Sequence, residues 1–86
     1  MVDKRKTLNE PKPSRAVMLL EILKDGEEIV TDDGSKWWIS PFYIPDVCIW
    51  IPTATIVVSQ NSDDPTFPYV LHNRDENESV NAALLS

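Results

Sequence analysis

Short apolar runs separated by turn-forming residues recur along the chain, and this pattern predicts strands rather than helices. The first three runs cover residues 16–23, 28–31 and 35–40. Asp-Gly pairs that end at Gly26 and Gly34 separate these runs, and such pairs are typical of tight hairpin turns. Two hairpin turns in such close succession predict a three-stranded antiparallel meander.

Three further runs complete the predicted fold, and they cover residues 53–59, 69–73 and 78–85. Residues 53–59 are uncharged and mostly β-branched, which makes them the strongest strand signal in the sequence. The last run alternates around Val80 and Ala82 as a half-buried strand does, with a short helix over residues 80–85 as the alternative. Five to six short strands predict an all-β fold, a small antiparallel SH3-like or OB-like barrel, because closure removes exposed sheet edges.

Charge divides the chain of 86 residues, which is long enough for one small domain, into two parts. Residues 1–15 hold 5 basic and 2 acidic residues together with two prolines, which predicts a disordered basic arm. Residues 16–86, the predicted barrel domain, hold 3 basic and 12 acidic residues, a net charge of −9. An acidic domain repels phosphate groups, so nucleic acid is disfavoured as a partner.

Residues 41–52 differ from the rest of the chain, because they contain three prolines, many apolar residues and a single charge, Asp46. Proline interrupts a central strand, so this region is predicted to be a long packed loop at one end of the barrel or a docking surface. Trp37 and Trp38 are adjacent in a predicted strand, so their side chains point to opposite faces and only one fills the interior. The other lies outside, exposed or buried by residues 41–52 folding back over it.

Two functional hypotheses follow from these aromatic residues. The first is a non-enzymatic protein-interaction module that binds a proline-rich or extended peptide of an unknown protein partner. Its predicted partner-binding residues are Trp38, Phe42, Tyr43 and Trp50. The alternative is an OB-type single-stranded nucleic-acid binder that stacks bases on the same side chains. Residues 48–52 also supply apolar area for a two-fold interface, so the sequence leaves monomer and homodimer open.

Residue patterns that carry catalysis or hold a cofactor are missing from the sequence. Two glycines are too few for a dinucleotide-binding or phosphate-binding loop. One cysteine, Cys48, and one histidine, His72, exclude an intramolecular disulfide and a structural zinc site. We interpret Cys48 as a small buried apolar residue and His72 as a partly buried strand residue. We therefore expect a protein without enzymatic activity, cofactor or metal.

Membrane and export signals are missing as well. The longest uncharged run, residues 47–62, contains Pro52 and is shorter than the ~18–20 apolar residues that a membrane-spanning helix needs. The N-terminal residues lack the apolar segment of a secretory signal. We therefore expect a cytoplasmic protein without membrane association.

The order of several landmark residues resembles that of a known group of proteins. The landmarks are Asp33-Gly34 with Trp37 and Ile39, Trp50-Ile51-Pro52 leading into Val57-Val58, then Pro68, Leu71 and Asn73, and finally Val80, Ala82 and Leu84. Across about residues 20–85, this order resembles small uncharacterised bacterial β-barrel proteins. One departure is Thr53, where that group often has glycine. The resemblance implies an SH3-like or OB-like barrel and no assigned activity.

Overall fold

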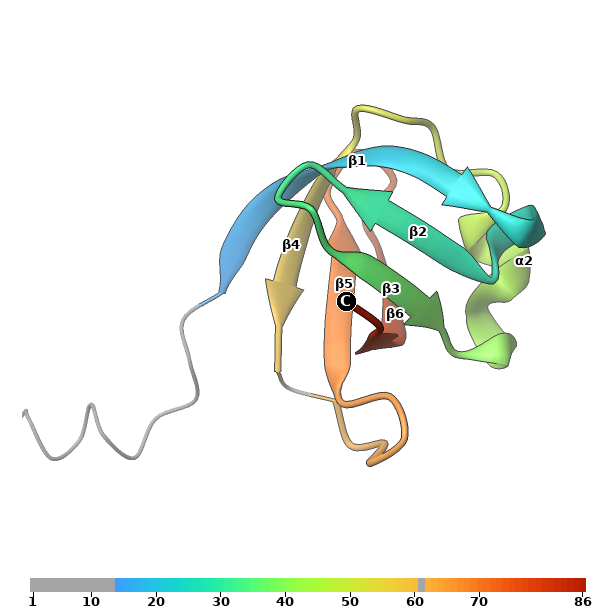
Figure 1. Ribbon diagram of the computed structural model, residues 1–86, viewed down its shortest axis with the longest axis vertical. Coiled ribbons are helices and arrows are strands. Elements are labelled where there is room, and N and C mark those ends of the chain that lie inside the picture. Colours follow the sequence, from blue (N-terminus) through green and yellow to red (C-terminus); the bar gives the residue numbers. More distant parts are fainter. Residues whose placement is uncertain (1–13, 61) are drawn as a thin grey trace, which may run out of the picture.

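The computed structural model describes residues 14–60 and 62–86, and it shows an antiparallel barrel (Figure 1). Its strands are β1 (Arg15–Leu23), β2 (Glu28–Thr31), β3 (Lys36–Ile39), β4 (Thr55–Ser59), β5 (Tyr69–Asn73) and β6 (Glu78–Leu84). Its helical segments are η1 (Lys24–Gly26), η2 (Pro41–Tyr43) and α2 (Ile44–Val47). The predicted all-β class and small antiparallel barrel are confirmed. Most of the predicted basic arm, residues 1–13, lies outside the described residues, and Arg15 already pairs with Val58 as part of the barrel.

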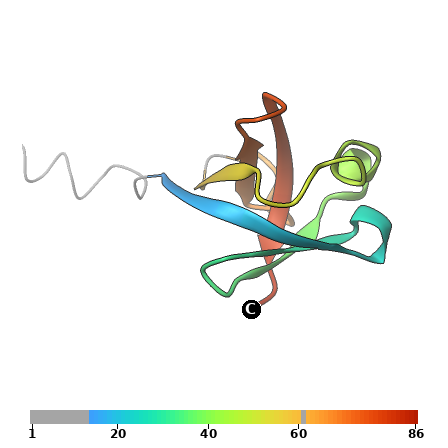
Figure 2. The ribbon, with the colours of Figure 1, turned by 90° about the horizontal axis from the view of Figure 1, so that it is seen from above.

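The barrel consists of two three-stranded meanders joined to each other along both sides. The strand order is β1-β2-β3-β6-β5-β4, with β4 returning to β1, and every pairing is antiparallel. The first meander is the one that the two Asp-Gly turns predict. Seen from above, the C-terminal end of the chain lies beside the β2–β3 hairpin (Figure 2), where the Lys36 N–H donates to the Ser86 carbonyl at 2.9 Å. Closure leaves none of the six strands with an unpaired side.

Strand β1 pairs with a strand of each meander and contains a β-bulge between its two halves. Its first half pairs with β4 and its second half with β2, and the register shifts between Leu19 and Glu21. A bulge inserts an extra residue and re-aims the side chains around it. Leu19 is therefore buried, whereas Leu20 and Glu21 are both exposed.

The core is built from the inward positions of the strands, as the period of two predicts. Its fully buried apolar residues on the strands are Leu19, Ile29, Trp37, Ile39, Ile56, Leu71, Val80 and Ala82. Trp37 thus fills the interior, and Trp38, with 40 % of its surface exposed, lies outside. Residues 78–84 form a strand, so the alternative of a C-terminal helix is wrong.

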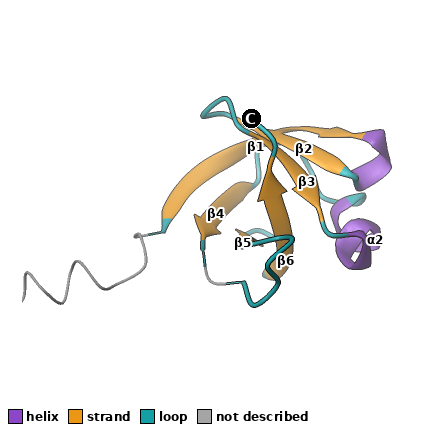
Figure 3. Cartoon of the chain, turned by 60° about the horizontal axis from the view of Figure 1, so that its bottom comes forward, coloured by secondary structure: helices purple, strands orange, loops and turns teal. Residues whose placement is uncertain are grey.

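Residues 41–47 form two short helical segments in place of the predicted loop, at one end of the barrel (Figure 3). Pro41 is the first residue of η2 and Pro45 is the second residue of α2, positions where the missing N–H of proline has no cost. The prolines that interrupt a strand here therefore start helices. Val47 and Trp50, at the end of α2 and just after it, are buried in the barrel core.

Thr53 adopts a backbone conformation that normally favours glycine. Its φ is +79°, and the Ala54 N–H donates to the Ile51 carbonyl at 3.2 Å, which closes a turn over residues 51–54. Thr53 and Ala54 both bond to Leu19, through distances of 2.7 and 2.9 Å, and so form a bulge opposite one residue of β1. A β-branched residue is strained at such a φ.

Substitution Thr53→Gly should therefore raise the free energy of unfolding by about 1 kcal/mol, since relief of strain exceeds the entropy that glycine adds to the unfolded chain. Urea denaturation followed by circular dichroism measures the change. Thr55→Gly is the matched control and should lower stability, because Thr55 lies in the extended strand β4. If Thr53→Gly lost stability instead, the inference that Thr53 is strained at its positive φ would be contradicted.

Candidate functional site

Two pairs of aromatic side chains lie on the outside of the barrel. Trp38 packs on Phe67 with ring centroids 4.7 Å apart, and Phe42 packs edge-on against Tyr43 at 5.0 Å. Trp38 is 40 % exposed and Phe42 is 80 % exposed, whereas Phe67 is buried. Trp38 and Phe42 are the two strongly exposed aromatic side chains among the described residues, and we treat them as the candidate site.

Strand register explains why Trp38 remains uncovered. Trp38 pairs with Ala83 on β6 and with Glu28 on β2, and residues directly opposite each other share a face of the sheet. Alanine ends at Cβ, so its side chain leaves the indole ring open to solvent. Phe67, from the segment between β4 and β5, supports one side of the ring. Residues 41–52 therefore do not bury the outer tryptophan, and that expectation is wrong.

Trp50, predicted as a partner-binding residue, belongs to the core instead. It is 3 % exposed, and its Nε1–H donates to Glu78 Oε1 at 2.8 Å. The Trp50 N–H donates to the Val47 carbonyl, so the chain keeps turning after α2 and directs the indole inward. Tyr43 is half-buried and packs against the core cluster. Of the four predicted residues, Trp38 and Phe42 are open to a partner.

Cys48 is exposed, so its interpretation as a buried apolar residue is wrong. Val47 and Trp50 take the inward positions around the end of α2, which leaves Cys48 outside. His72 is half-buried and lies opposite Ser79, with 2.7 Å between Nδ1 and Oγ. Within the described ranges, no group of three His, Cys, Asp or Glu side chains is placed to hold a metal ion.

The outward residues of β6 and β5, the two strands that follow β3 around the barrel on the Ala83 side of Trp38, include no Asp, Glu, Lys or Arg. Register places these outward residues in rows across the two strands. They are Val70, His72, Ser79, Asn81 and Ala83. Protein–protein interfaces are depleted of charge at their centres, so this face has the composition of an interface core.

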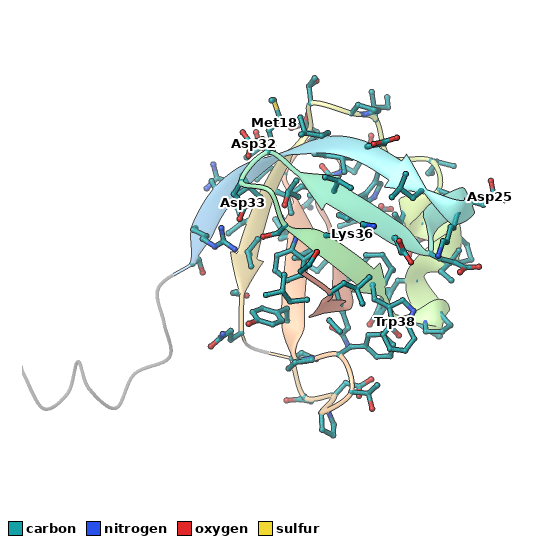
Figure 4. The ribbon with its side chains drawn as sticks, in the orientation of Figure 1. Met18, Asp25, Asp32, Asp33, Lys36 and Trp38 are labelled. Atoms are coloured by element: carbon teal, nitrogen blue, oxygen red, sulfur yellow. The ribbon has the colours of Figure 1, made fainter. Side chains whose placement is uncertain are left out.

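A hydrogen-bond chain connects the core to the β2–β3 turn, away from the aromatic site (Figure 4). Trp37 Nε1–H donates to Thr31 Oγ1 at 3.0 Å, and the Thr31 hydroxyl donates to Asp33 Oδ1 at 2.7 Å. The Asp33 carboxylate also accepts from Ser35 and pairs with Arg15. Partial burial acts to raise the pKa of Asp33, but hydrogen bonds from Arg15, Thr31 and Ser35 together hold that pKa well below its usual value.

The low pKa of Asp33 predicts a loss of stability in acid. The ionised carboxylate stabilises the fold fully above the unfolded pKa of about 4, and this contribution falls as the pH drops toward the lower folded pKa. Asp33→Asn should therefore lose less stability than the wild type when urea unfolding is compared at pH 7 and pH 2.5. Asp63→Asn, an exposed loop position, is the control and should follow the wild type. If Asp33→Asn and the wild type lost the same amount of stability between pH 7 and pH 2.5, the low pKa assigned to Asp33 in the folded protein would be contradicted.

Comparisons with known proteins provide no relative from which a function could be inferred. No family model matches the chain, and no curated protein or solved structure matches it either. In the part of the chain that the structure describes, no helix is both long and apolar enough to cross a lipid bilayer.

Proposed function

We propose that this protein is a non-enzymatic interaction module that binds an extended segment of a protein partner across Trp38 and Phe42. The exposed indole of Trp38 carries this proposal. Phe67 holds the ring in place before any partner arrives, so binding costs little side-chain entropy. Tryptophan is also among the residues that contribute most to protein–protein binding energy.

The surroundings of Trp38 support a protein partner of low charge. The outward residues of β5 and β6 next to it are uncharged or small, and Phe42 supplies a second apolar contact on η2, four residues along the chain. A partner segment lying across the β6 and β5 side of Trp38 would desolvate few charges, whereas on the β2 side it would meet the ion pair of Glu28 with Lys24. Mainly apolar contacts to the two aromatic rings would then provide the affinity.

The alternative of a single-stranded nucleic-acid binder is not favoured. Such sites combine aromatic residues with a basic groove. Among the described residues the basic ones are Arg15, Lys24, Lys36 and Arg74, and the first two form ion pairs with Asp33 and Glu28. Twelve acidic residues in the same part of the chain oppose phosphate binding.

A photo-crosslinking residue in place of Phe42 tests the proposal in cells that express the protein. We expect a discrete crosslinked protein that disappears when Trp38→Ser is added, with the fold of this variant checked by circular dichroism. The same photo-crosslinker in place of Glu76, in the β5–β6 turn, is the control and should not capture that protein. Capture from both positions, or capture that survives Trp38→Ser, would count against the proposed site.

A further inference from the structure

Four exposed aliphatic side chains form a second apolar area, which we call the aliphatic surface. Its members, with their exposed fractions, are Met18 (36 %), Leu20 (48 %), Ile49 (66 %) and Ile51 (66 %). Figure 4 shows Met18 on β1, well away from Trp38 at the end of β3. The Met18 end of the aliphatic surface is therefore separate from Trp38.

Backbone hydrogen bonds bring the two halves of the aliphatic surface together. The bonds of Thr53 and Ala54 to Leu19 place the turn over residues 51–54 beside β1, next to Leu20. Ile49 and Ile51 flank the buried Trp50, so both lie on the outer side of the segment. The strained Thr53 is exposed at the same place, and strain of this kind often accumulates at functional surfaces.

Acidic residues surround the aliphatic surface. Asp32 exchanges two hydrogen bonds with the backbone of Met18, both of 2.9 Å, and Glu21 follows Leu20 directly on β1. At the other end, Asp46 belongs to α2 and Asp25 to η1. These two segments touch, since Gly26 lies against the backbone of Ile44 and of Cys48, the residue that follows α2. Among the described residues, none of these four carboxylates takes part in an ion pair, and Lys24, the base nearby, pairs with Glu28.

We propose that the aliphatic surface binds a cationic amphipathic segment of a partner protein. The apolar side chains of this partner segment would cover Leu20, Ile49 and Ile51. Its lysine or arginine residues would lie over the four carboxylates named above, which we call the acidic rim. A second copy of the chain fits less well. A two-fold contact would place the same acidic rims against each other in a protein whose net charge is −6.

Titration with a fluorescent amphipathic helical peptide of leucine and lysine, about 14 residues long, tests the proposal. Fluorescence anisotropy gives the affinity, and amide chemical shifts locate the binding site. We expect shifts at residues 18–21 and 46–53, and about tenfold weaker binding to Ile51→Ser. Leu85→Ser, which removes an exposed leucine elsewhere, is the matched control and should bind as the wild type does.

A charge comparison separates specific binding from general attraction to an acidic protein. Glu21→Gln/Asp46→Asn should weaken binding several-fold, whereas Asp63→Asn/Asp75→Asn, with the same change in net charge, should have little effect. Equal weakening by both pairs would overturn the proposal, and so would shifts centred on Trp38 or no binding by the wild type. Self-association in sedimentation that Ile51→Ser abolishes would assign the surface to a second copy instead.

Discussion

Replacing Gly26 with alanine should lower the free energy of unfolding by about 3 kcal/mol, through two costs that add. The first is conformational, because Gly26 has a φ of +104°, where L side chains are strained. The second is steric. A Cβ at this position would lie 3.0 Å from the Ile44 carbonyl oxygen, 3.1 Å from Cys48 Cβ and 3.2 Å from Cys48 N. Two of these atoms are backbone, so α2 itself would have to shift.

Gly34 provides the matched control for this prediction. It has a φ of +90°, but a Cβ there would meet nothing within 4 Å. Gly34→Ala therefore pays for the conformation alone and should cost about 1 kcal/mol. Urea denaturation of the two variants, followed by circular dichroism, compares the two costs directly. Equal losses would show that α2 moves away from Gly26 freely, contrary to its close packing.

The two glycines also show how far the sequence determines this fold. An Asp-Gly pair is a local signal, because the turn needs a positive φ whatever surrounds it. Both hairpins were therefore predictable, and the last three strands followed from short apolar or β-branched runs bounded by polar residues. The contact of Gly26 with Cys48 was not predictable, because it depends on how α2 packs against the β1–β2 connection. A local pattern contains no information on which turn a distant segment will cover.

Residues 41–50 were the hardest to predict for a related reason. Proline excludes a central strand, but it also starts helices, and Pro41 and Pro45 do the latter. Because α2 is only four residues long, no helical period was available to show that Cys48 faces outward and Trp50 inward. These side chains received their positions from the packing of the barrel end, so Trp50 was wrongly assigned to the partner-binding site.

The candidate site was predictable in part. Alternation in a strand required Trp37 and Trp38 to face opposite ways, and the pairing with β2 and β6 decides which one is buried. Phe67, which supports Trp38, was missed. Its signal was an isolated aromatic residue between Pro65 and Pro68 in an otherwise polar loop. A lone aromatic residue in such a loop needs an apolar neighbour from elsewhere in the fold.

The adjacent tryptophans allow the same substitution to be compared on the two faces of one strand. Trp37→Leu should lower the free energy of unfolding by about 3 kcal/mol, since it leaves a cavity in a fully buried site. It also removes the edge-on packing on Tyr69 at 5.1 Å and the N–H that donates to Thr31 Oγ1. The buried Thr31 hydroxyl would still donate to Asp33, but its oxygen would no longer accept a hydrogen bond from Trp37.

Trp38→Leu should cost less than about 1 kcal/mol, because a half-exposed ring loses little burial and leaves no closed cavity. Circular dichroism is the appropriate probe, since both variants change the tryptophan fluorescence. Because both variants introduce the same residue, the difference between the two losses of stability reports which face of β3 is buried. A larger loss in Trp38→Leu would mean that the outer ring is covered in solution, and the partner-binding surface proposed around it would then be closed.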